Sequence, residues 1–156
     1  MIPEAELVRK EFIVREMDFP ESIALTRNSL LRWCCLSLGL ISKNESRDKG
    51  FLVFDSLFYF IFSKKINPTT LDIQSQIKTK HKIDMSEKLI RYHLNRLIEL
   101  NLIQRDNLKY KINPSPNSEK RNSLSESYNA WVQKQINIEL EKNFSVLEKL
   151  QKSYEK

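Results

Sequence analysis

The sequence predicts a mainly α-helical protein that carries one small β-hairpin. Apolar residues recur at helical spacing over most of the 156 residues, and they alternate with polar ones only near residues 102–112. The chain contains only two glycines, too few for an all-β fold with many tight turns. A hydrophobic content of 40% is enough for a packed core. We expect four segments: a helical N-terminal extension (1–48), a compact domain (49–113), a polar linker (114–123) and a long helix (124–156).

The N-terminal extension is predicted to contain two helices. The first covers residues 3–17, where Pro3 lies near the first turn and acidic residues precede basic ones. The second begins at a cap formed by Thr26 or Asn28 and ends near Leu38, because Gly39 is a natural helix stop. A polar connector follows over residues 42–50.

The segment FLVFDSLFYFIF, residues 51–62, is predicted to be the central helix of the domain. Ten of its twelve residues are apolar, so the helix is hydrophobic on nearly all sides. A helix of this kind is normally covered by others. Its length is too short to span a membrane, so we expect no membrane-bound segment.

Two shorter helices should follow the central one. Thr69 and Asp72 have the spacing of a capping box, which predicts a helix that runs to about Lys80. Asp84 or Ser86 should cap the next helix, over residues 86–100. Asn at position 101 tolerates the left-handed conformation that often ends a helix.

A β-hairpin is predicted directly after the second of these helices. Two short alternating runs, residues 102–105 and 108–112, flank the pair Asp106-Asn107, which should form a two-residue turn. Leu108, Tyr110 and Ile112 then share one face of the second strand, and its lysines share the other.

The stretch IRYHLNRLIELNLIQRDNLKYKI, residues 90–112, resembles the recognition helix and wing of winged helix-turn-helix regulators of bacteria and archaea, most closely the ArsR-like and PadR-like groups. Asn101 stands where those families usually have glycine. The resemblance implies a DNA-binding winged-helix fold over residues 50–113. Metal sensing is not implied, because the cysteines of ArsR-like metal sites are absent. The matching residues are Ile90, His93, Leu94, Leu97, Leu102 and Ile103.

The positive charge of the chain is concentrated in its middle third. The net charge of +6 divides into −1 for residues 1–63, +6 for residues 64–113 and +1 for residues 114–156. Concentrated positive charge is typical of a polyanion-binding surface. A solvated basic face without a partner is the alternative interpretation.

Helix 86–100 is expected to enter the major groove of double-stranded DNA, because the N-terminal half of such a helix meets the bases. Arg can bond guanine and Asn can bond adenine, whereas Lys, Tyr and the hairpin cations suit phosphates. Threonines at a helix N-terminus could bind a phosphate. The expected DNA-binding residues are Thr69, Thr70, Lys80, Lys82, Ser86, Lys88, Arg91, Tyr92, Asn95, Arg96, Arg105, Lys109 and Lys111.

Other roles remain open for some of these residues. His93 within the same helix is interpreted as a packed structural histidine, and Tyr92 could belong partly to the core. The hairpin lysines could serve only to protect an edge strand from aggregation.

The C-terminal segment predicts a long helix that needs a partner. Its apolar residues, from Leu124 to Tyr154, recur at a mean spacing slightly above the helical repeat, so a strict coiled coil is not indicated. A helix over these residues is roughly 46 Å long, more than a small domain can cover. We expect a homodimer, with a helix that folds back or frays as the alternative. The expected dimer contacts are Tyr128, Trp131, Val132, Ile136, Leu140, Phe144, Leu147 and Leu150.

The sequence contains no pattern for catalysis, a cofactor or a metal site. Cys34 and Cys35 are adjacent and cannot readily bridge each other, which favours reduced thiols in the cytoplasm. An effector is not identified, although the aromatic residues near Phe54, Phe58 and Trp33 could enclose a ligand pocket.

The function expected from these observations is that of a dimeric, sequence-specific, nucleoid-associated regulator of transcription. A winged-helix module that binds other proteins is the alternative from a different class. A plasmid or viral replication or maintenance protein would use the same chemistry on DNA.

Overall fold

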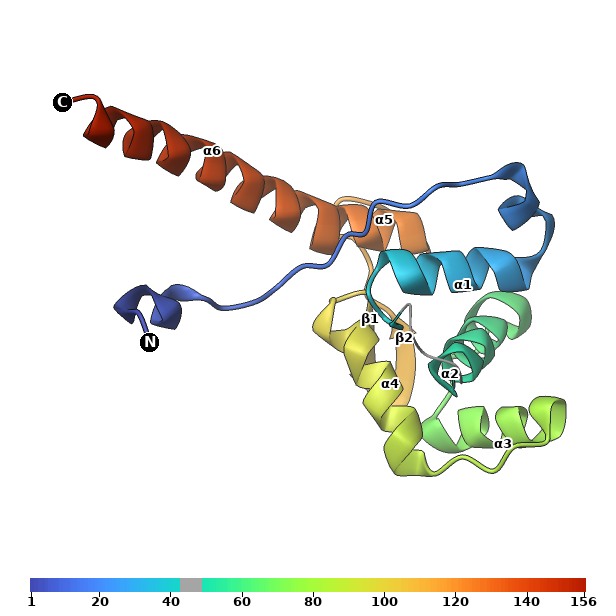
Figure 1. The fold of residues 1–156 in the computed structure, drawn as a ribbon. Coiled ribbons are helices and arrows are strands. Elements are labelled where there is room, and N and C mark those ends of the chain that lie inside the picture. Colours follow the sequence, from blue (N-terminus) through green and yellow to red (C-terminus); the bar gives the residue numbers. More distant parts are fainter. Residues whose placement is uncertain (43–48) are drawn as a thin grey trace.

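The computed structural model describes residues 1–42 and 49–156 and is mainly helical with a single antiparallel hairpin (Figure 1). Most of the predicted connector, residues 43–48, lies outside the described residues. No helix in the described ranges is both long and apolar enough to cross a membrane. The elements are α1 (Arg27–Ser37), α2 (Lys49–Phe58), α3 (Thr70–His81), α4 (Glu87–Glu99), β1 (Ile103–Asp106), β2 (Lys109–Ile112), α5 (Leu124–Tyr128) and α6 (Lys134–Tyr154).

Helix α2 is the centre of the core, as its composition predicts. Val53, Phe54 and Leu57 have no solvent-exposed surface. Helices α3 and α4 and the hairpin pack around it and bury Ile73, Ile77, Ile90, Leu94, Leu97, Ile103, Tyr110 and Ile112. A π-helical turn, Tyr59–Lys64, prolongs α2 and is called the first π turn below.

The predicted caps of α3 and α4 form. The Thr69 hydroxyl accepts a hydrogen bond from the Asp72 amide at 3.1 Å, and the Asp72 carboxylate accepts one from the Thr69 amide at 2.9 Å. Ser86 rather than Asp84 caps α4, through the amide of Leu89 at 3.1 Å. Asn101 follows α4 with a φ of 64°, the left-handed conformation expected there.

The hairpin turn lies one residue later than predicted. The strand register pairs Ile103 with Ile112 and Asp106 with Lys109, so Asn107 and Leu108 form the turn. Both have positive φ, 50° and 68°, as a type I′ turn requires. Leu108 is therefore at the exposed tip and not on the buried face with Tyr110 and Ile112.

The predicted helix over residues 3–17 does not form. Pro3–Leu7 is a short 3₁₀ turn, residues 8–20 have no regular secondary structure, and Glu21–Leu25 is another 3₁₀ turn. Arg15 provides the physical reason. Its guanidinium donates hydrogen bonds to the carbonyls of Leu36 and Ile41, each at 2.8 Å, and these contacts with the end of α1 outweigh the weak local helix preference.

Helix α1 has the predicted ends. Thr26 caps its start by accepting a hydrogen bond from the Ser29 amide at 3.1 Å. After Leu38, Gly39 has a φ of +70°, and a Cβ atom there would lie 2.7 Å from Cγ2 of Ile13. Position 39 therefore requires glycine both for its backbone conformation and for the close approach of the N-terminal segment.

The C-terminal helix forms over nearly the predicted length, with a second π turn, Asn129–Gln133, between α5 and α6. A π turn contains more residues per turn than an α-helix, which accounts for part of the wide apolar spacing. Helix α6 projects from the domain, as Figure 1 shows, and its residues have no buried member.

Candidate nucleic-acid interface

Three parts of the basic region meet at one corner of the domain. The Tyr110 amide of β2 donates to the Pro68 carbonyl at 2.8 Å, and Thr69 forms a β-bridge with Lys109. These contacts hold the hairpin tip beside the start of α3. The amide group of Gln74 donates to the Met85 carbonyl at 2.8 Å, which fixes the segment before α4 against the first turns of α3.

Helix α4 presents a polar stripe opposite its buried face. Lys88, Tyr92 and Asn95 recur at i, i+4 and i+7, and all three are exposed. They lie about 200° around the helix from the buried residues that occupy the equivalent positions two residues later. Lys88 and Asn95 have no hydrogen-bond or ion-pair partner among the residues that the structure describes. The stripe is therefore available to a ligand.

Arg91 lies beside this stripe in a weak ion pair. Its Nη1 is 3.6 Å from Oε1 of Glu87, one turn earlier, and both side chains are about half exposed to solvent. An exposed pair of this kind contributes about 0.3–0.5 kcal/mol, so a stronger acceptor can replace Glu87. Arg91 is held near the N-terminal half of α4, as the sequence predicts.

The three hairpin cations do not share one face. Arg105 is opposite Tyr110 on the face that packs against the helices, and its guanidinium lies 5.2 Å from the Tyr110 ring centroid. Lys109 and Lys111 are on the outer face, where Lys111 pairs with Asp106 at 3.5 Å. Arg105 and Lys109 are exposed and border the corner from two sides.

The hydroxyl groups at the helix starts are already engaged. Thr70 is only 3% exposed, and its hydroxyl is 3.1 Å from the Tyr110 hydroxyl, so its side chain cannot contact a phosphate. Thr69 and Ser86 use their side-chain oxygens as helix caps. These residues shape the corner and leave ligand binding to their neighbours.

Lys80 and Lys82 lie at the other end of α3. Lys80 Nζ is 2.9 Å from Oδ2 of the buried Asp55, which it neutralises. Lys82 has a left-handed backbone and donates from its side chain to the Thr79 carbonyl at 3.0 Å. Because α3 is about 18 Å long, both lysines are distant from the corner around Thr69.

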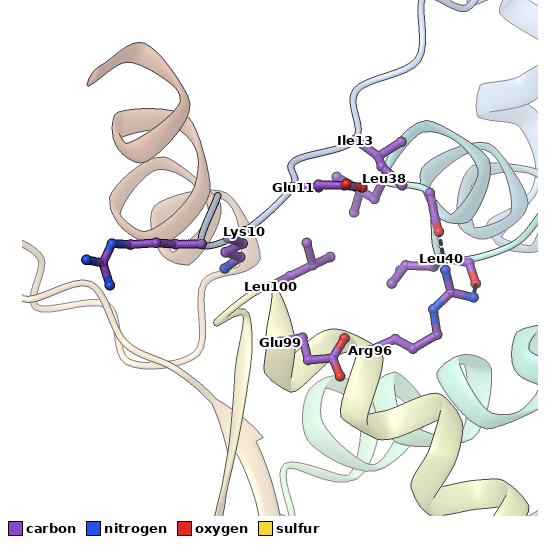
Figure 2. A pocket seen from close by; sticks show the side chains of 10 residues that line it. Lys10, Glu11, Ile13, Leu38, Leu40, Arg96, Glu99 and Leu100 are labelled. Carbon is purple, nitrogen blue, oxygen red and sulfur yellow. Dashed lines mark hydrogen bonds between the residues drawn. The ribbon is translucent and has the colours of Figure 1, made fainter. Parts of the chain in front are cut away.

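Arg96 serves the fold instead of the exposed stripe. Its guanidinium donates to the carbonyls of Gly39 and Leu40, the second at 2.6 Å (Figure 2). A cation suits this position because carbonyl groups at the end of a helix are unpaired and carry partial negative charge. Together with Arg15, it closes the C-terminal end of α1. No local pattern predicts this role, because the carbonyls are far away in the sequence.

His93 packs against the core, as expected for a structural histidine. Its ring makes an edge-to-face contact with Phe54, with centroids 6.3 Å apart, and a second one with Tyr92 at 5.2 Å. Tyr92 itself is 59% exposed, so it belongs to the polar stripe and not to the core.

The residues expected at a dimer interface divide into two groups. Val132 is 3% exposed within its own chain, Tyr128 and Ile136 pack against the same core, and Trp131 donates to the Pro114 carbonyl at 3.1 Å. The second group, Leu140, Phe144, Leu147 and Leu150, is exposed along α6. Only the second group is open to a partner.

Comparisons with known protein families, with curated proteins and with solved structures give no match to this chain. Within residues 1–42 and 49–156, no group of three or more His, Cys, Asp or Glu side chains could hold a metal ion. The function of the chain is therefore inferred from the geometry of the corner and its charge.

Proposed function

We propose that this chain is a winged helix-turn-helix protein that binds double-stranded DNA sequence-specifically as a homodimer and regulates transcription. One observation carries the proposal: the open polar stripe of α4 lies beside the hairpin cations, in the only strongly positive third of the chain. In this assignment α3 and α4 form the helix-turn-helix, β1 and β2 form the wing, and the resemblance to ArsR-like and PadR-like regulators covers the same residues.

The proposed contacts follow from the chemistry of each exposed side chain. With α4 in the major groove, Arg91 can bond guanine with two hydrogen bonds, and Asn95 can bond adenine. Lys88 and Lys109 contact phosphates on either side, and Arg105 reaches the backbone or minor groove from the wing. Thr70, Lys80 and Arg96 are left out of this interface because their partners lie within the chain.

A second copy of the chain is the proposed partner of α6. Phe144 is 66% exposed, and the other apolar residues of the stripe are exposed to a similar degree, which is unusual for a helix without a partner. A twofold axis would let the stripe cover itself, since the same face serves both subunits. The dimer would present two copies of α4 to half-sites roughly 34 Å apart.

Selection of bound duplexes from a random pool at two salt concentrations tests DNA recognition. An enriched motif with twofold symmetry is expected, and affinity should fall steeply with salt because bound cations release counterions from DNA. Arg91→Ala should lose preference at one base position, at a cost of about 1–3 kcal/mol. Lys109→Ala should weaken binding about equally on all sequences.

Lys120→Ala is the matched control, because it removes one positive charge from the exposed linker, outside the corner. It should leave the motif unchanged and affect the affinity less than Lys109→Ala does. Absence of binding to any duplex at low salt would exclude the proposal.

Sedimentation velocity of Leu147→Glu tests the dimer. The variant places a charge on the apolar stripe of α6 and should sediment as a monomer, whereas wild-type protein sediments as a dimer. Lys149→Glu, on the opposite side of the helix, should remain dimeric. A monomeric wild-type chain would contradict the proposed assembly.

Two exposed leucines favour the protein-binding alternative. Leu71 and Leu108 are 58% and 65% exposed, and both lie at the corner, where a protein partner could cover them. Alanine at both positions should leave DNA affinity nearly unchanged under the main proposal. A protein that ignores all duplexes but needs these leucines to bind a partner chain would support the alternative.

A further inference from the structure

A cavity of about 690 Å³ lies between α1, the end of α2 and the start of the C-terminal helix. Trp33 of α1, Phe62 of the first π turn and Tyr128 of α5 line three of its sides. Leu97 and Leu102 line it from within the core, where they are 1% and 3% exposed. Ligand pockets of proteins have volumes of about 300–1,000 Å³ and are mostly apolar, so this cavity has the usual size and character.

Both π turns that the described residues contain border this cavity. The first π turn contributes Tyr59, Phe62 and Ser63, and the second contributes Gln133. A π turn costs stability and is found frequently at functional sites, where it widens or redirects a helix. Two such turns on opposite helices, at one cavity, are a second observation that points to a binding site.

The charges at the cavity select an uncharged ligand. Asp55 lines it, but Lys80 neutralises its carboxylate at 2.9 Å. Arg27 lies at the solvent-exposed start of α1. The Cys34 thiol also lines the cavity, and burial raises its pKa, so it stays protonated and neutral. Polar groups that can orient a ligand come from Ser63 and other side chains near solvent.

We propose that this cavity binds one uncharged, largely apolar small molecule per chain. A second copy of α6 is a poorer occupant, because a helix about 10 Å wide fills roughly 420 Å³ per turn. The cavity would accept fewer than two turns, whereas the exposed apolar stripe of α6 extends over about four. The stripe and the cavity therefore require different partners.

The uncharged fluorescent probe N-phenyl-1-naphthylamine tests the site in the full-length protein. We expect saturable binding at one probe per chain, measured by probe fluorescence, with energy transfer from Trp33 in the cavity wall. Ser63→Trp and Ser125→Trp fill the cavity from exposed rim positions and should each weaken binding at least tenfold. Ser75→Trp, at an exposed position of α3 away from the cavity, should bind like the wild type.

Three results would overturn the proposal. Probe fluorescence that does not saturate, or equal affinity in all three tryptophan variants, shows that the cavity takes no ligand of this class. If the probe binds monomeric Leu147→Glu but not the wild type, a second copy of the chain fills the cavity. Probe binding is measured without DNA, so its outcome is separate from that of the proposed DNA function.

Discussion

Replacing Arg96 by alanine should destabilise the fold while the folded protein keeps its DNA preference. The side chain connects α4 to the end of α1 through the carbonyls of Gly39 and Leu40. Arg91, five residues earlier, has the same chemistry but an exposed position and a weak pair with Glu87. The two arginines therefore separate a contribution to stability from a contribution to binding.

The size of the effect follows from the hydrogen bonds that alanine cannot make to the two carbonyls. A hydrogen bond that involves a charged group contributes about 1.5–3 kcal/mol, and water can partly replace the donor because Arg96 is only half-buried. Arg96→Ala should therefore lower the free energy of unfolding by about 2–4 kcal/mol. Loss of the exposed Arg91 pair should cost only about 0.3–0.5 kcal/mol.

Urea unfolding followed by tryptophan fluorescence measures both values, at one protein concentration because a dimer's stability depends on it. Arg96→Lys keeps the charge but loses the planar fork, and it should unfold between Arg96→Ala and wild type. DNA selectivity is then compared at a temperature where every variant is folded. An Arg96→Ala protein as stable as wild type, or one that loses base preference as Arg91→Ala does, would refute the reasoning.

Four further predictions concern single positions. Gly39→Ala should lose about 2 kcal/mol in urea unfolding, because a left-handed alanine is strained by about 1–2 kcal/mol and its Cβ collides with a neighbouring side chain; an unchanged midpoint contradicts this. Leu108→Gly should gain about 1 kcal/mol by the same measurement, because glycine suits the second position of a type I′ turn; a loss would place the turn elsewhere. Thr69→Ala should lose about 1 kcal/mol with its capping bond, and Thr69→Ser should restore most of it. Burial raises the pKa of the Cys34 thiol, so alkylation by iodoacetamide should keep accelerating at pH values where a free cysteine has already reached its maximal rate; a normal pH profile contradicts the burial.

Helix ends could be predicted from the sequence because capping is local. Thr26, Thr69, Ser86 and Asn101 each lie within a few residues of the groups they satisfy. The central helix was equally predictable, because a segment that is apolar on all sides has few other positions in a fold.

The N-terminal segment and the hairpin turn were not predictable in the same way. Residues 3–17 have a helical pattern, but Arg15 bonds carbonyls more than twenty residues away. The turn avoids the favourable Asp106-Asn107 pair, because the observed register places Ile103 opposite Ile112 in the core. Burial across the hairpin thus outweighs the strain of a left-handed Leu108.

The candidate site was predictable as a stripe but not residue by residue. Lys88, Tyr92 and Asn95 follow from helical periodicity and are exposed as expected. Arg96 looks like a member of the same surface, yet its acceptors lie more than fifty residues earlier. Only tertiary structure distinguishes an arginine that binds carbonyls of its own chain from one that is open to a ligand.

The second π turn sets the direction in which the apolar side of α6 faces. Each residue added to or removed from a helix rotates everything beyond it by about 100°. Deletion of one residue within Asn129–Gln133 would convert the turn to ordinary α-helix and rotate Phe144 and Leu147 around the axis, while the domain before it stays unchanged. One codon could thus reorient the two subunits and alter the spacing of any paired sites they recognise.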